Sequence, residues 1–228
     1  EESTHIVAPH AAQWVARVAF GSRVLTQTKL ISILGEKQVN GVEVERGGRR
    51  ERIDCDGIIF SGRFVPEAAL LTTSPLLIDP STGGPLVDQY ARCSDAAYFA
   101  AGNLLRPVEA SWTVWQEGRD VAGAIAASLN GSLPAATHFT SLAAQEPVRY
   151  VCPQKIAFPA PIPPALPINI RLARAARGRV QIHDGTRAKY GQRRNWLPER
   201  RIVLPWPADD VHHAGGLHIG IDETGKGG

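Results

Sequence analysis

The residues best suited to chemistry lie where an apolar run gives way to glycine and then to a helix. Tyr98–Ala101 is a short apolar run, and Gly102 and Asn103 follow it directly. This pattern predicts a buried strand that ends where only a bare backbone fits. A helix is expected over Ser111–Leu129, and the N-terminus of a helix offers free N–H donors and partial positive charge. The sequence therefore predicts a ligand edge of the kind that open α/β sheets use.

The expected helix has a packing face with polar residues between its members. Asn130-Gly131 would close the helix, because both residues tolerate a left-handed backbone. The expected packing residues are Val114, Val121, Ala122, Ile125 and Leu129.

Two motifs in this region carry a family resemblance. Tyr98–Asn103 (Tyr-Phe-Ala-Ala-Gly-Asn) resembles the second flavin-binding motif of the pyridine nucleotide-disulphide oxidoreductase superfamily. Ile53–Glu67, an apolar run leading into Gly-Arg-x-x-Pro, resembles the signature at which that superfamily leaves its NAD(P)H domain. Gly102–Trp112, followed by Gln-Glu-Gly-Arg at 116–119, is similar to the flavoprotein subunits of opine oxidase, hydrogen cyanide synthase and amino-acid dehydrogenase complexes.

The resemblance covers residues 1–131 and implies an α/β fold with parts of two Rossmann-like nucleotide-binding domains. Residues 1–62 would be the C-terminal half of an NAD(P)-binding domain, and residues 63–131 the C-terminal part of an FAD-binding domain. After residue 131 the chain changes character: residues 132–167 hold eight prolines and are predicted to be a linker or surface strap. Alternating apolar residues over 168–228 predict a small antiparallel β domain.

The family's glycine loops are missing from this chain. The superfamily places Gly-x-Gly-x-x-Gly loops for FAD and for NAD(P)H ahead of this region, and Gly215–Gly220 has neither their spacing nor their context. The chain also contains no methionine and opens with Glu1-Glu-Ser. We therefore expect an incomplete C-terminal fragment that is inactive alone and holds only part of each nucleotide site.

The resemblance implies which residues touch the cofactor, while the catalytic residues stay unassigned. Asn103 stands where the superfamily usually has Asp; its carbonyl can accept hydrogen bonds from the ribityl hydroxyls of flavin, without the charge of a carboxylate. A cap or turn role for Asn103 is the alternative. The implied cofactor-binding residues are Gly62, Arg63, Ala101, Gly102, Asn103, Ala110, Ser111 and Trp112.

Several of these positions have simpler interpretations. Gly62-Arg63 can be a tight turn with an exposed arginine, and Glu109 an ordinary first-turn carboxylate or a catalytic acid. Trp112 and Trp115 can belong to the core or line the flavin ring. Asp79–Pro85 is expected to be a hairpin turn, with a phosphate-binding loop as the alternative.

The N-terminal part is predicted to contain one helix and several β segments. Residues 11–20 favour a helix that Gly21 ends. The segments with β character are Arg23–Thr28, Leu30–Leu34, Val39–Glu45 and Arg52–Phe60.

Charge, cysteines and histidines exclude several classes of function. The net charge of +3 makes no strong claim on nucleic acid or membrane. Residues 171–201 hold nine arginines, for which a solvated face or subunit contact, an acidic partner and nucleic acid are the alternatives. Three scattered cysteines argue against a disulphide framework or redox dithiol, and the histidines at 212, 213 and 218 lack a recognised metal spacing. No signal peptide or transmembrane run occurs, which favours a cytoplasmic protein.

These inferences together predict an FAD-dependent NAD(P)-type oxidoreductase. It would be the flavoprotein subunit of a heteromeric amino-acid or opine dehydrogenase-like complex. Its cofactor would be FAD, with NAD(P) as a second cofactor if the first domain binds that nucleotide. Hydride would pass from a small-molecule substrate through the flavin, without a dithiol relay, to a partner subunit or cofactor. The alternative is a non-catalytic assembly or binding subunit with vestigial nucleotide-binding folds.

Overall fold

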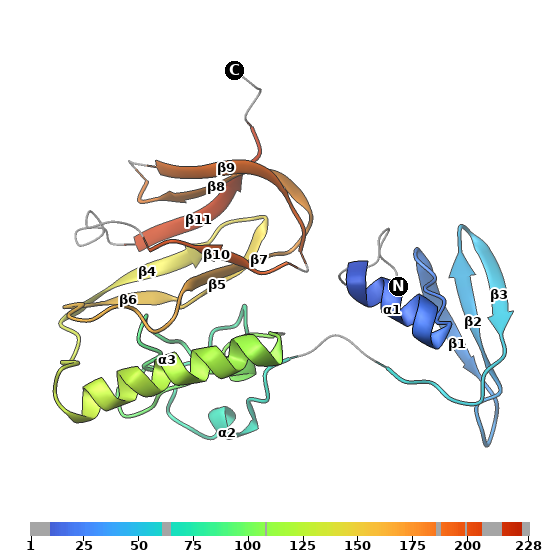
Figure 1. Cartoon of the computed structure of the whole chain (residues 1–228), viewed down its shortest axis with the longest axis horizontal. Coiled ribbons are helices and arrows are strands. Elements are labelled where there is room, and N and C mark those ends of the chain that lie inside the picture. The colour runs from blue at the N-terminus through green and yellow to red at the C-terminus, as the bar shows by residue number, and fades with distance from the viewer. Residues whose placement is uncertain are drawn as a thin grey trace. The chain divides into compact units, whose positions relative to one another are not determined.

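The structure is a computed structural model that divides into two compact units, residues 1–63 and 64–228 (Figure 1). It describes residues 10–60, 65–107, 109–185, 188–198, 200–206 and 216–224. The chain is a mixed α/β protein with three sheets among these residues, as the sequence predicts. No helix in the described part is long and apolar enough to cross a membrane.

The first unit consists of one helix and a three-stranded antiparallel meander. Helix α1 (His10–Phe20) ends at Gly21, whose φ of 60° is accessible to glycine at little cost. The strands are β1 (Thr28–Leu34), β2 (Gly41–Arg46) and β3 (Arg49–Ile53), in the order β1-β2-β3. The predicted helix is therefore confirmed, and the β segments predicted over Leu30–Leu34 and Val39–Glu45 correspond to β1 and β2.

Two predicted β segments of this unit are wrong in whole or in part. Residues 23–27 are not a strand, because Gln27 has a φ of 52° and interrupts any extended run. The segment predicted over Arg52–Phe60 is a strand only as far as Ile53. Beyond it Ile59 is 95% exposed, and an extended backbone with no neighbouring strand gains no ladder of hydrogen bonds.

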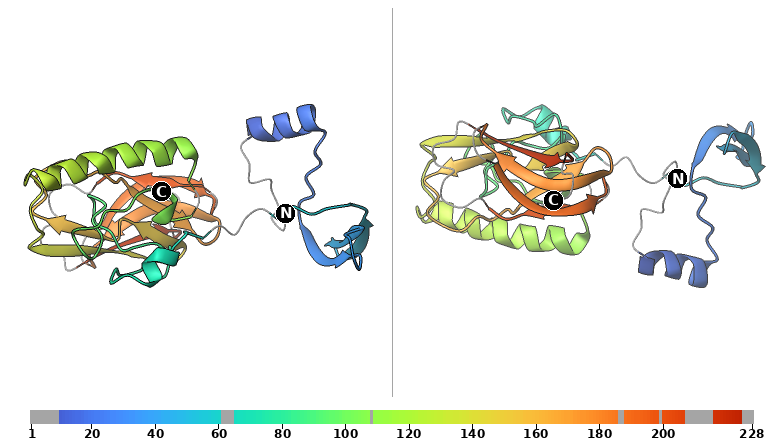
Figure 2. Two further views of the ribbon diagram at one scale, coloured as in Figure 1. Left: turned by 90° about the horizontal axis from the view of Figure 1, so that it is seen from below. Right: turned by 90° about the horizontal axis from the view of Figure 1, so that it is seen from above.

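The second unit begins with short helices and turns and continues as strands. The helices are α2 (Ala69–Thr72), the 3-10 turn η1 (Gly102–Leu104) and α3 (Ser111–Leu129). The strands are β4 (His138–Ala144), β5 (Val148–Cys152), β6 (Lys155–Phe158), β7 (Ile168–Leu172), β8 (Ala176–His183), β9 (Ala188–Trp196), β10 (Ile202–Leu204) and β11 (Gly216–Asp222). Helix α3 runs along one side of these strands (Figure 2).

The strands form two sheets that share one core. The larger sheet has the order β6-β4-β11-β8-β9 and the smaller the order β10-β7-β5; all pairs are antiparallel except β11 with β4. Buried side chains from both sheets meet in a single apolar cluster, which includes Leu142, Ile170 and Ile219. The alternation therefore predicted β7, β8, β10 and β11 correctly, whereas β9, which has no comparable alternation of apolar residues, was not predicted.

The predicted linker over residues 132–167 is largely part of this fold. Strands β4, β5 and β6 lie within it, and only residues 159–167 form a strap without helix or strand. The strap is fixed: Tyr90 Oη donates to the Ile162 carbonyl over 2.9 Å, and the Leu166 N–H donates to the Gln89 carbonyl. The number of prolines led to the wrong prediction for residues 132–158. Five of the eight prolines lie in the strap, whereas the residues before it carry alternating apolar side chains.

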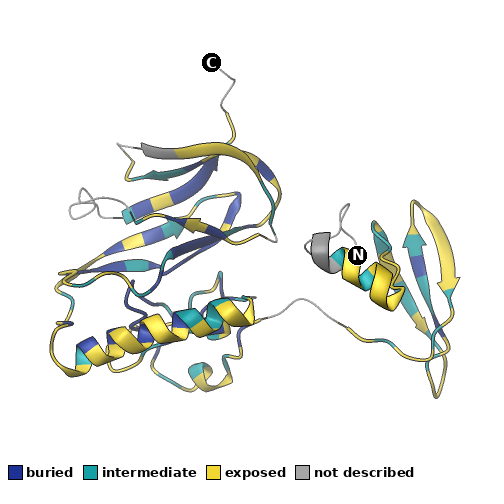
Figure 3. Cartoon of the chain, viewed as in Figure 1, coloured by how far each residue is buried: buried dark blue, intermediate teal, exposed yellow. Residues whose placement is uncertain are grey.

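Helix α3 has the predicted bounds but buries a different face. Its buried residues are Glu117, Val121, Ala124 and Ala127, whereas Leu129, predicted to pack, is 85% exposed (Figure 3). Ala124 and Ala127 pack with Tyr90, which is fully buried. Small side chains let the helix lie close to that ring, so the face with the larger residues points outward.

The segment before α3 is attached to the strands by two buried glutamines. The Gln89 side chain both donates to the Ala157 carbonyl and accepts from the Ala157 N–H, each over 2.8 Å. Gln154 Oε1 accepts from the Val87 N–H over 3.0 Å. Residues 64–131 and the strands therefore form one unit rather than two domains.

Candidate functional site

The predicted flavin-contact residues of the second unit come together at the start of α3. The name α3 corner is used here for residues 101–103 and 110–112. Gly62 and Arg63 lie outside the described residues. The apolar run before the corner pairs only through an Arg92–Phe99 bridge, so it is a short bridged segment rather than a full strand.

Gly102 is required here by its own backbone and by the helix beside it. Its φ is 73°, and a Cβ at this position would lie 2.8 Å from Val114 Cγ1. The sequence predicted a place where only a bare backbone fits, and the contact that demands it comes from α3.

Asn103 closes the loop that leads into α3. Its Oδ1 accepts a hydrogen bond from the Glu109 N–H over 2.8 Å, and the residue is exposed. Asn103 therefore has the turn role that the sequence analysis gave as the alternative to a flavin contact. Its side chain lies at the surface beside the start of the helix.

The N-terminus of α3 carries no side-chain cap. Ala110 is the N-cap residue with an extended backbone (φ −67°, ψ 145°), and its side chain has no capping group. Ala110, Ser111 and Trp112 are all exposed. The start of this 19-residue helix is thus exposed, without a side-chain cap, and carries the positive end of the helix dipole.

Two tryptophans lie exposed next to this helix end. Trp112 is 70% exposed and Trp115 is 59% exposed, so neither belongs to the core of the second unit. The Arg119 guanidinium lies 5.0 Å from the centre of the Trp115 ring. Large exposed aromatic surface beside a helix N-terminus suits an aromatic ligand with anionic character.

A buried ion network that the sequence reasoning missed supports the corner from below. The Arg106 side chain is 1% exposed; its Nη2 donates to Glu117 Oε2 over 2.5 Å and its Nε to Glu109 Oε1 over 3.3 Å. Glu117 Oε1 accepts from the Gly102 N–H over 2.6 Å. A signal was available, because Glu117 lies four residues before Val121 on the buried face of the helix.

Cys152 lies against this network from β5. Arg106 Nη1 is 3.8 Å from its sulfur, and burial raises the pKa of the Cys152 thiol to about 11. Burial alone would lower the pKa of Arg106, but Cys152 and Glu117 outweigh that effect and raise it. Arg106 therefore stays charged, and Cys152 is a buried structural thiol, as the cysteine pattern predicts.

The network also reaches the β10 strand. Arg201 Nε lies 3.7 Å from Glu109 Oε2, and the Glu109 side chain is only 5% exposed. Glu109 is thus shared between two arginines, Arg106 and Arg201, instead of projecting freely from the first turn of the helix.

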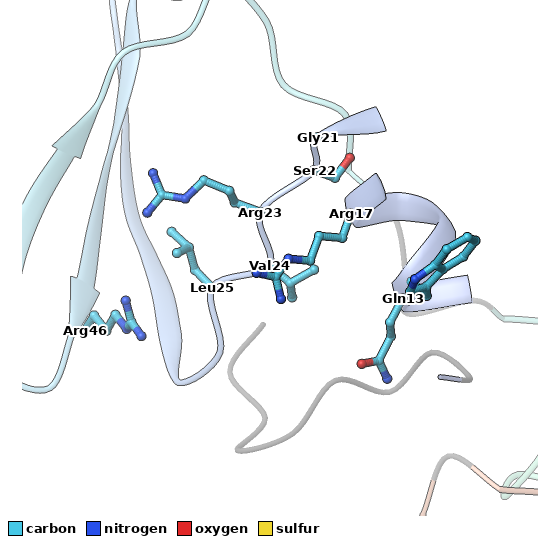
Figure 4. Close-up of a pocket in the computed structure, with 9 residues that line it drawn as sticks. Gln13, Arg17, Gly21, Ser22, Arg23, Val24, Leu25 and Arg46 are labelled. Atoms are coloured by element: carbon cyan, nitrogen blue, oxygen red, sulfur yellow. The ribbon is translucent and has the colours of Figure 1, made fainter. Parts of the chain in front are cut away.

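The first unit contains a separate hollow of about 770 Å³ (Figure 4). Arg17 from α1, Arg23 from the segment after it and Arg46 from β2 line this hollow together with Trp14. Three guanidinium groups around one hollow make it electropositive.

Metal ligands do not gather in the described part of the chain. No group of three or more His, Cys, Asp or Glu residues there lies close enough to hold an ion. His183 and His218 stack at 5.4 Å on neighbouring strands, while residues 212 and 213 lie outside the described ranges.

Comparisons with known proteins give only partial likenesses. The chain matches no protein-family model and no curated protein. A thioredoxin reductase from T. acidophilum is similar over 54% of this chain and 41% of its own, with 20% identity and a TM-score of 0.47. One from Gloeobacter violaceus is similar over 56% and 40%, with 24% identity and a TM-score of 0.28. The chain spans about two-fifths of the length of these structures.

Proposed function

We propose that this chain is part of an FAD-dependent, NAD(P)-type oxidoreductase and that the α3 corner receives the flavin. The observation that carries the proposal is the uncapped, exposed N-terminus of α3 beside Gly102-Asn103. The Tyr98–Asn103 motif, which resembles a flavin-binding motif, ends at this helix start.

The residues of the corner fit such a cofactor. Ser111 and Trp112 present backbone N–H groups at the positive end of a helix, where an electron-rich ring edge is stabilised. Asn103 is exposed beside the helix start, and its amide would also hydrogen-bond the hydroxyls of the ribityl chain. When bound, FAD would supply the hydride-accepting chemistry, and the role of these residues is to bind and orient it.

The buried network gives the corner its rigidity. Glu117 fixes the Gly102 N–H and is itself held by Arg106, so the loop does not depend on the ligand for its shape. A site that is formed in advance loses less free energy when it orders a ligand.

We further propose that the protein is a cytoplasmic flavoprotein subunit of an amino-acid or opine dehydrogenase-like complex. The resemblance of Gly102–Trp112 supports this finer assignment. In the first unit, taken as the C-terminal half of an NAD(P)-binding domain, Arg17, Arg23 and Arg46 suit a phosphate-bearing nucleotide. The rival is a non-catalytic assembly subunit, whose nucleotide folds are vestigial.

The test is flavin content of the intact protein that contains this chain. The purified protein should be yellow, with flavin absorbance near ~450 nm, and Asn103→Ala should lower the flavin-to-protein ratio. Asn130→Ala is the matched control, because Asn130 lies at the other end of α3 and should leave the ratio unchanged.

A colourless intact protein that gains no absorbance when incubated with FAD would favour the assembly subunit. Equal flavin content in the wild type and Asn103→Ala would mean that Asn103 serves only to close the turn, as its bond to Glu109 does.

A further inference from the structure

A hollow in the β-rich unit lies between two strand edges that no other strand in the described part of the chain covers. Strand β9 is the last strand of the larger sheet, and β10 is the last strand of the smaller one. The two follow each other in the chain, so the edges of both sheets meet on one side of the core. The space between them, called here the β9–β10 groove, has a volume of about 380 Å³.

The groove has an apolar floor. Val180 and Leu204 are buried at 6% and 7% exposure and line it from the two sheets. Trp196 lies half-buried beside them, and its Nε1 donates to the Gly178 carbonyl over 3.0 Å. Because the indole N–H is already bonded, the ring offers the groove only apolar surface.

The polar side chains that line the groove are those of Arg194, Arg201 and Gln192. Arg194 Nη2 donates to Gln192 Oε1 over 2.8 Å, which fixes one side of the guanidinium. Arg201, whose side chain is 32% exposed, lines the same groove. None of the described lining residues is acidic.

These features suit one class of ligand. Arginine presents a planar set of donors that matches a carboxylate, and an apolar floor selects a ligand with an apolar body. The volume lies near the lower end of small-molecule sites, which range from about 300 to 1,000 Å³. A nucleotide with several phosphates would leave its charges over the apolar floor, at a desolvation cost.

We propose that the β9–β10 groove binds a small carboxylate with an aromatic or branched apolar body. The carboxylate binds Arg194, with Arg201 as the second cation, and the apolar body lies against Trp196 and Leu204. The groove does not include the residues of the α3 corner, although Arg201 also lies 3.7 Å from Glu109 of the ion network beneath that corner. The proposal holds whether or not the corner binds flavin.

The experiment is a titration of the full-length chain, labelled with ¹⁵N, with phenylacetate and with phenylacetamide, its neutral counterpart. The indole N–H resonance of Trp196, assigned with Trp196→Phe, reports occupancy of the groove. Phenylacetate should shift this resonance in a saturable way and bind about tenfold or more tightly than phenylacetamide, as expected for hydrogen bonds to charged groups.

Variants separate the groove from general positive charge. Arg194→Gln should raise the phenylacetate dissociation constant about tenfold or more. Arg177→Gln is the matched control: Arg177 is an exposed arginine on β8 whose neighbours Ala176 and Gly178 are buried, so it points to the other face of the sheet, and the variant should bind normally.

Three results would overturn the proposal. They are a Trp196 resonance that does not move, equal affinity for phenylacetate and phenylacetamide, and an equal loss of affinity in Arg177→Gln and Arg194→Gln. The last result would mean that the arginines attract anions only through net charge.

Discussion

The Glu117 carboxylate holds the Gly102 N–H over 2.6 Å across 15 residues of sequence. The same carboxylate receives Arg106 on its other oxygen, so a single side chain connects the loop, the helix and a buried cation. The shape of the α3 corner therefore depends on a side chain that is itself buried.

Replacing Glu117 with alanine should be strongly destabilising. Arg106 would keep only its weaker contacts with Glu109 and Cys152, and a buried charge that loses its main partner costs about 3–5 kcal/mol. Urea unfolding followed by circular dichroism measures the loss. Asp120→Ala on the exposed side of α3 is the control and should change the unfolding free energy by less than about 0.5 kcal/mol. Equal stability of the two variants would show that the network contributes little.

Substitution by alanine should lower the stability of the protein at Gly102 and raise it at Gly118. Gly102→Ala forces a side chain into the left-handed region and against Val114, at a cost of at least about 2 kcal/mol. Gly118→Ala lies within α3 with nothing within 4 Å of its Cβ, and should stabilise the protein by about 0.5–1 kcal/mol. Thermal unfolding of both variants tests the pair. A destabilised Gly118→Ala, or an unaffected Gly102→Ala, would contradict this account of the corner.

The buried thiol of Cys152 should make the protein less stable at alkaline pH. Its pKa is about 11 in the folded protein against an ordinary value of 9.0, so between these pH values the unfolded chain has lost a proton that the folded chain keeps. The stability that this group contributes is thus complete below pH 9 and is lost as pH rises to about 11, by roughly 2–3 kcal/mol.

The Cys152→Ala variant isolates that effect. The variant is less stable at neutral pH because it leaves a cavity, but its unfolding free energy should fall less steeply between pH 9 and 11 than that of the wild type. Tyrosines and lysines titrate in both proteins and cancel in the difference. Parallel pH profiles would show that Cys152 ionises as easily in the folded protein as in the unfolded chain.

The sequence predicted the elements better than it predicted their partners. Helix α3 and the strands β7, β8, β10 and β11 followed from apolar spacing, because that spacing is set by each element's own geometry. The buried face of α3 could not be predicted from apolar spacing, since Ala124 and Ala127 pack against the ring of Tyr90, which lies far away in the sequence. Arg106 gave no local signal of burial, because its partners Glu117 and Cys152 are brought to it only by the fold.

The candidate site was predicted in part for the same reason. The glycine and the helix start are local features, and both lie where the motif placed them. The hydrogen bond from the Glu109 N–H to Asn103 and the ion pair of Arg201 with Glu109 could not be predicted, because they depend on how the loop is folded.

The paired bonds of Gln89 with Ala157, and the bond of Gln154 with Val87, have a consequence for engineering. Residues 64–131 cannot be transferred to another protein as a self-sufficient segment, because some of their polar groups are satisfied by the strands that follow. Any chimera or shortened version has to carry residues up to at least 158, because a cut after Gly131 would leave buried amides with water as their sole alternative partner.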